Sequence, residues 1–95
     1  MIPKETIDDI FNAARIEEVV GDFVRLKKQG ANYMGLCPFH DDRSPSMSVS
    51  PVKGIYKCFS CGASGNSISF LMDHEQITYP EALKILAKKY NIQIV

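Results

Sequence analysis

All three cysteines and one of the two histidines of this 95-residue chain fall into two closely spaced pairs. Two residues separate Cys37 from His40, two separate Cys58 from Cys61, and seventeen lie between the pairs. A two-residue gap lets both side chains of a pair reach one metal ion from a tight turn. Four sulfur and nitrogen ligands complete a tetrahedral zinc site, so the sequence predicts one structural Zn²⁺ without an open catalytic position.

The alternative to a metal site is a chance cluster of cysteines, which two matched spacings and a complete ligand count disfavour. Both pairs fall in turns beside predicted strands, which indicates a zinc ribbon and not a finger with ligands on a helix. The sequence leaves open which nitrogen of His40 would bind the metal.

The length and composition predict one small globular domain over residues 1–95, since 45% of the residues are hydrophobic and 23% are charged. A core of this size is marginal alone, and bound metal would stabilise it. With His40 as fourth ligand no cysteine is left over, which indicates a reducing, intracellular compartment. No signal peptide or membrane-spanning apolar run is present, so no membrane partner is expected.

The apolar periodicity predicts an α+β fold: a small antiparallel sheet flanked by N-terminal and C-terminal helices, with a zinc-ribbon core over about 23–62. Asn66 is the expected cap of one helix, and Thr78 with Glu81 forms a capping box for another. Gly62 follows a ligand, where a positive φ is expected. The expected helices cover 3–14, 16–23 and 79–90, with a further helix that begins at 67 and holds His74 in its last turn. The expected strands cover 24–27, 33–36, 47–49, 55–58 and, as an edge strand, 92–94.

The formal net charge is zero, but the charges are unevenly distributed. Residues 1–22 carry six acids and two bases, a net −4, whereas residues 23–61 carry six bases and two acids, a net +4. A basic segment is typical of nucleic-acid binding, and a solvated charged face is the alternative.

Basic and aromatic residues alternate in this segment, a combination that suits single-stranded nucleic acid, because bases stack on rings while cations follow the phosphates. For Phe59 packing beneath the metal is the favoured alternative, as it is for Phe39, whereas Tyr33 and Tyr56 are evenly balanced. The expected phosphate contacts are Lys27, Lys28, Arg43, Lys53 and Lys57, and the candidate stacking residues are Tyr33, Tyr56 and Phe59.

The sequence contains no recognisable catalytic centre. The adjacent carboxylates Asp8–Asp9 and Asp41–Asp42 diverge on a helix or strand, so neither pair predicts a two-metal site. His74 is expected near a helix C-terminus as a surface histidine. No nucleophile with its base and no phosphate-binding glycine loop is present.

Several stretches together resemble the amino-terminal zinc-binding domain of bacterial DNA primases, and the resemblance covers nearly the whole chain. The segments that carry it are LKKQGANYMGLCPFH at 26–40, SPS at 44–46, CFSCG at 58–62 and GNSISFLM at 65–72. This combination is far more specific than the metal spacing alone.

The resemblance implies a division of labour within a longer protein. In this family the primase synthesises short RNA primers on single-stranded DNA for replication, and the zinc domain engages the template. Nucleotidyl transfer belongs to a separate RNA polymerase domain with bound Mg²⁺, acting in cis or in trans. We therefore expect a fragment of a bacterial cytoplasmic primase that works at the replication fork, whose further C-terminal region would meet the replicative helicase.

Two other interpretations remain open at this point. The zinc ribbon could be a protein-interaction module that docks on the polymerase domain, with DNA contact incidental. The same module could also belong to a phage or plasmid primase-helicase.

Overall fold

The computed structural model describes residues 1–94, in which two helices are followed by the five strands of one sheet and then by two more helices. The sheet is antiparallel throughout, and its strands lie in sequence order. The elements are α1 (Lys4–Ala13), α2 (Ile16–Gly21), β1 (Lys27–Gln29), β2 (Asn32–Gly35), β3 (Met47–Ser50), β4 (Ile55–Cys58), β5 (Ser64–Gly65), α3 (Ser67–Glu75) and α4 (Tyr79–Lys89). The α+β architecture predicted from the sequence is confirmed.

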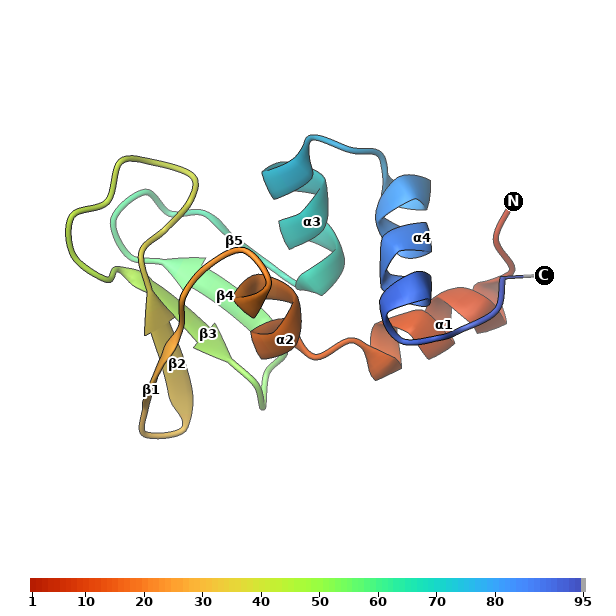
Figure 1. The fold of residues 1–95 in the computed structure, drawn as a ribbon, viewed down its shortest axis with the longest axis horizontal. Coiled ribbons are helices and arrows are strands. Elements are labelled where there is room, and N and C mark those ends of the chain that lie inside the picture. The colour runs from red at the N-terminus through yellow and green to blue at the C-terminus, as the bar shows by residue number, and fades with distance from the viewer. Residues whose placement is uncertain (95) are drawn as a thin grey trace.

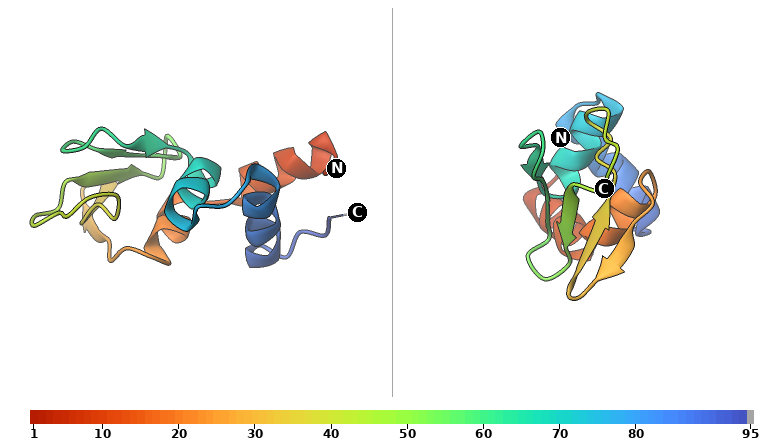
Figure 2. Two further views of the ribbon diagram at one scale, coloured as in Figure 1. Left: turned by 90° about the horizontal axis from the view of Figure 1, so that it is seen from above. Right: turned by 90° about the vertical axis from the view of Figure 1, so that its left-hand side faces the viewer.

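The molecule is elongated, about 43 × 27 × 18 Å, with the sheet at one end and α1 and α4 at the other (Figure 1). Helices α2 and α3 lie between these ends, against one side of the sheet, and both chain termini lie at the helical end (Figures 1 and 2). The loops after β2 and β4 project from the opposite end (Figure 1). No helix within residues 1–94 has the length and apolar character required to cross a bilayer.

The sheet has one face toward the helices and one face toward solvent. Cross-strand partners share a face, and successive residues of a strand alternate between faces. Val49 lies opposite Tyr56, and Met47 lies opposite Cys58; all four are fully buried on the helix side. The row Lys27, Met34, Ser48, Lys57 and Ser64 occupies the other face.

Side-chain caps begin the last two helices, as the sequence predicts. The Asn66 side chain accepts a hydrogen bond from the backbone N–H of Ser69, whose hydroxyl accepts the Asn66 N–H in return. Thr78 and Glu81 make the same reciprocal pair at the start of α4. Each box satisfies two backbone donors that a helix start leaves unpaired.

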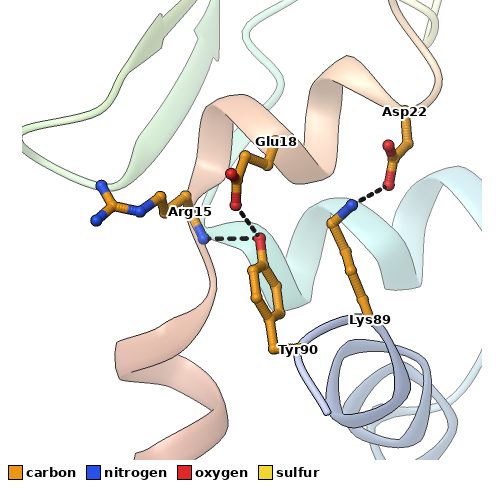
Figure 3. Close-up of polar contacts among 5 residues, drawn as sticks. All are labelled: Arg15, Glu18, Asp22, Lys89 and Tyr90. Carbon is orange, nitrogen blue, oxygen red and sulfur yellow. Dashed lines mark hydrogen bonds and ion pairs between the residues drawn. The ribbon is translucent and has the colours of Figure 1, made fainter.

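Polar contacts link the end of α4 to the α1–α2 junction (Figure 3). The Tyr90 hydroxyl donates to Glu18 at 2.8 Å and accepts from the Arg15 backbone N–H at 3.1 Å. Nearby, Lys89 Nζ lies 2.7 Å from an Asp22 carboxylate oxygen. These contacts hold α2 between the sheet and the terminal helices.

The expected strand at 24–27 is only partly correct, because β1 begins at Lys27. Val24 and Leu26 instead pass over Gly35, where a Cβ would lie 2.9 Å from Val24 Cγ1 and 3.0 Å from Leu26 Cδ2. The alternation of apolar residues there reflects packing, and only Gly35 leaves room for it.

The expected edge strand at 92–94 is wrong. After α4, Asn91 adopts a left-handed φ of 56°, and the Ile92 N–H donates to the Ala87 carbonyl at 2.8 Å, as at a helix C-terminus. Ile92 and Ile94 pack against the core without pairing to a strand. Conversely, the two-residue strand β5 carries no alternation that could have predicted it.

Candidate metal centre and nucleic-acid interface

The four predicted ligands converge at the loop end of the sheet. Their ligand atoms all lie within 4.8 Å of one another, with Cys37 Sγ 3.8 Å from Cys61 Sγ and His40 Nε2 3.3 Å from Cys58 Sγ. Tetrahedral zinc with Zn–S bonds of about 2.3 Å separates its sulfurs by roughly 3.8 Å. The cluster therefore fits one zinc ion, and the geometry presents Nε2 of His40 to it.

The sheet and its turns position these ligands. Cys37 follows β2 and Cys58 ends β4, so β3 spaces the two pairs. In the second pair, the Cys61 N–H points to Cys58 Sγ at 3.4 Å, and the Gly62 N–H donates to the Cys58 carbonyl at 3.0 Å. Gly62 has a φ of 81°, which confirms the expected left-handed turn.

The electrostatics of the cluster favour a bound cation. Burial, together with the neighbouring Cys58 and Cys61, raises the pKa of Cys37 to about 12. Burial also opposes ionisation of Cys58, but polar contacts with the Ser46 hydroxyl, the Cys61 N–H and His40 outweigh it and lower its pKa to about 5. Adjacent thiolates repel one another, and a divalent ion removes that obstacle.

Asp42 also belongs to the centre, although it is not a ligand. Its carboxylate accepts the Cys37 backbone N–H at 2.9 Å and the Ser46 hydroxyl at 2.7 Å, and these bonds lower its pKa. Sequence reasoning missed this role because it treated Asp41 and Asp42 only as a possible two-metal pair. The role could have been predicted from the position of Asp42, an acidic residue two positions after the ligand His40 in a short polar loop.

A shallow groove of about 250 Å³ lies on the solvent face of the sheet. Phe59 at its edge is 70% exposed, and Lys57 Nζ lies 5.7 Å from the centre of that ring. The groove is lined by short polar, basic and apolar side chains: Asn32, Ser48, Ser50, Lys53, Ile55, Lys57 and Phe59. We call the solvent-facing side of the sheet, which includes this groove, the open face. Asn32, Ser48 and Ser50 were not predicted, although the period of two along the strands places them beside Lys57.

Comparison with known proteins agrees with this geometry. The CHC2 zinc finger family matches residues 2–95. The chain belongs to this family. This CHC2 zinc finger is 53% identical over 91 residues to the DNA primase of Halalkalibacterium halodurans, a match that covers 96% of the chain and 15% of that protein. It is 50% identical over 93 residues to the DNA primase of Listeria monocytogenes, covering 98% and 15%.

A solved structure shows the same fold. The crystal structure of the Aquifex aeolicus primase, which comprises its zinc binding and RNA polymerase domains, aligns with a TM-score of 0.88 at 42% identity. The alignment covers 95% of this chain and 22% of that one. The CHC2 zinc finger therefore spans a small part of the proteins it resembles, about 15% of the first curated relatives.

The predicted nucleic-acid residues of this CHC2 zinc finger do not all share one surface. Lys27 and Lys57 lie in the same cross-strand row of the open face, and Lys53 lies at its groove. Lys28 is exposed but lies on the helix side of β1, opposite Tyr33, and Arg43 is exposed in the loop after β2.

The assignment of Tyr56 to base stacking is wrong, because its side chain is fully buried. It packs edge-to-face on Phe70, with ring centroids 5.2 Å apart, and lies 5.9 Å from Phe39. Phe39 therefore packs in the core, as favoured from the sequence. Tyr33 lies on the same helix-facing side, opposite Val49, and is half-buried there, away from the open face.

His74 is not the plain surface histidine that the sequence suggested. Its ring stacks on Phe70, with centroids 5.4 Å apart, and lies 4.5 Å from the ring of Phe23. The side chain is only 25% exposed. The sequence correctly predicted that His74 lies near a helix C-terminus. It did not predict the aromatic cluster around His74, which includes Phe23 after α2 and Phe39 in the loop after β2.

Proposed function

We propose that this chain is the template-binding domain of a DNA primase and that its open face binds single-stranded DNA. The observation that carries the proposal is the exposed Phe59 ring beside Lys57, on the uncovered face of the sheet that carries the four candidate metal ligands. The names of the relatives support the wider assignment, since they are DNA primases.

The chemistry of the open face suits a single strand better than a duplex. A base can stack on Phe59, because its ring is exposed and every base has an apolar face. Lys27, Lys53 and Lys57 would follow the phosphates, while the hydroxyl and amide groups between them can hydrogen-bond base edges. Arg43 and Lys28 would extend the positive surface beyond the groove.

In this proposal the zinc ion is structural and the reaction takes place elsewhere. Four ligands leave the ion no position for a substrate, and a single zinc site accounts for all cysteines of the chain. Primer synthesis would belong to an RNA polymerase domain, which we expect to use Mg²⁺. The Aquifex aeolicus primase structure comprises a zinc binding domain and an RNA polymerase domain. The replicative helicase is a further expected partner of the whole protein, at the replication fork.

Fluorescence anisotropy with a labelled single-stranded oligonucleotide tests the proposal. We expect Phe59→Ala to weaken binding by about 1–3 kcal/mol through lost stacking. Lys57→Gln should weaken binding and reduce the dependence of log K on log salt by about 0.7 for each lost phosphate contact. Lys84→Gln, on the exposed side of α4, is the matched control. An affinity unchanged between low and moderate salt would contradict the proposal.

A protein-interaction module is the second candidate, favoured by exposed apolar side chains around the same face. Leu36 is 48% exposed, Val52 89% and Ile55 41%. Charge reversal at Lys27 and Arg43 in the full-length protein separates the two candidates. If priming falls while oligonucleotide binding by this chain is unchanged, the face docks on protein and not on the template.

A further inference from the structure

A short series of polar contacts joins the two ligand pairs of the metal centre. Asp42 Oδ2 accepts the Cys37 backbone N–H at 2.9 Å and the Ser46 hydroxyl at 2.7 Å. On its other side, Ser46 Oγ lies 3.4 Å from Cys58 Sγ. Because Cys37 and Cys58 are carried by strands that are not neighbours, these contacts cross the site from one pair to the other.

Ser46 also holds the second ligand turn through its main chain. The Phe59 N–H donates to the Ser46 carbonyl at 2.9 Å. Phe59 directly follows the ligand Cys58, and Ser46 directly precedes Met47, the first residue of β3. The side chain and carbonyl of one residue therefore fix the position of the second pair, while the carboxylate of Asp42 fixes the backbone of the first.

We propose that Asp42 and Ser46 are positioning residues of the metal centre, which hold the two ligand pairs together and slow the loss of zinc. Phe39 is the main apolar anchor of this loop, and it packs on Tyr56 and Phe70 of the core. Between Leu36 and Ser46 only Cys37 is fully buried, so the contacts that link one ligand pair to the other are polar. Groups that fix metal ligands in place typically change metal affinity about 10- to 100-fold when they are removed. The proposal does not depend on DNA binding.

The loop offers a matched pair of carboxylates. Asp41 is adjacent, equally charged and exposed, and its carboxylate takes no part in these contacts. Both hydrogen bonds to Asp42 end on one oxygen, so an asparagine carbonyl can replace it with little change in geometry. Asp42→Asn therefore separates the hydrogen bonds from the charge.

The test is the rate at which the zinc-loaded chain transfers its ion to the coloured chelator 4-(2-pyridylazo)resorcinol. We expect Asp42→Ala and Ser46→Ala each to speed transfer about 10-fold or more. Asp41→Ala should match the wild type, and Asp42→Asn should stay within about 3-fold of it. Because the two residues act in series, the double variant should be no faster than the faster single variant.

Replacement of zinc by Co²⁺ gives a readout that a general loss of stability does not move. The ligand-field absorption bands should shift in Asp42→Ala and Ser46→Ala, and return with Asp42→Asn and Ser46→Thr. Equal rates for Asp42→Ala and Asp41→Ala, or unshifted bands in both alanine variants, would overturn the proposal. If Asp42→Ala does not load metal, Ser46→Ala decides: a wild-type transfer rate overturns the proposal and a faster one supports it.

Discussion

The sheet end and the helical end of this CHC2 zinc finger are stabilised by different kinds of contact. In the loop between β2 and β3 and the turn after β4, only Cys37 is fully buried and Phe39 packs against the core; the remaining contacts are short and polar and surround the four candidate metal ligands. At the other end, α4 alone buries Ala82, Leu83, Leu86 and Ala87 and begins with a capping box. One small chain can therefore combine a metal-dependent part with a conventionally packed part.

Removal of zinc is the strongest way to test this contrast. Chelation should unfold the ligand loops and melt the central sheet, because structural zinc contributes on the order of 10 kcal/mol to such domains. Amide hydrogen exchange should show protection lost in β2 to β4 and better retained in α4. Zinc loss with unchanged circular dichroism and an unchanged thermal midpoint would show that the sheet end does not need its metal.

Phe70 tests the junction between the two ends. It is fully buried on α3 and contacts Tyr56 of the sheet and Phe39 of the metal loop. Phe70→Ala should lower the free energy of unfolding of the zinc-loaded chain by about 3–5 kcal/mol, measured by urea denaturation. Phe11, 47% exposed on α1, is the control, and its replacement by alanine should cost at most about 1 kcal/mol. Equal losses of unfolding free energy for the Phe70 and Phe11 variants would show that the packing around Phe70 does not stabilise the junction.

Tyr90 tests the polar link that joins α4 to α2 (Figure 3). Tyr90→Phe removes the hydrogen bond to Glu18 and should cost about 1 kcal/mol near neutral pH. Burial, and then the nearby Glu18, raise the pKa of Tyr90 to about 12. A raised pKa favours the protonated folded state, so this contribution is present below about pH 10 and lost as the pH rises toward 12.

The stability of the wild type should therefore approach that of Tyr90→Phe across this alkaline range in urea titrations. Tyr79→Phe, at an exposed position at the start of the same helix, is the control and should change little. A gap between wild type and Tyr90→Phe that widens above pH 10 would contradict the assigned role of the hydroxyl.

The smallest effect is expected at the ion pair between Lys89 and Asp22. The contact is short at 2.7 Å, but the side chains are 29% and 52% exposed, so water and salt screen it. Lys89→Met should cost about 0.5 kcal/mol at low salt and less at high salt, by urea denaturation, with Lys88→Met as the neighbouring control. A salt-independent loss above about 2 kcal/mol would show that α4 is held mainly by this pair.

The metal centre could be predicted from the sequence because its signal is local. Two residues between ligands define a turn, and four ligands define a tetrahedral site wherever the fold brings the pairs together. The same holds for the caps at Asn66 and Thr78, whose partners lie three residues away. Each ligand pair and each cap is complete within a few residues, so its signal can be read locally, whereas the meeting of the two pairs depends on the sheet.

The nucleic-acid residues were harder to predict because a strand has two faces. Tyr56 and Lys57 are adjacent and therefore point to opposite sides, so they could not both belong to one proposed DNA-binding surface. The period of two separates them, but it does not say which side the helices cover. Tyr56 is buried against Phe70, a residue distant in the sequence, and this contact shows which side of the sheet the helices cover.

The four candidate metal ligands, the order of most strands and helices, and the family all follow from the amino-acid sequence alone. Packing in three dimensions was required to show which side of the sheet faces solvent, that His74 stacks in an aromatic cluster, and that Asp42 and Ser46 link the two ligand pairs. The physical reason is that ligand spacing and helix caps are local properties of the chain. Exposure and cross-strand contacts depend on residues that come together only when the sheet and helices pack.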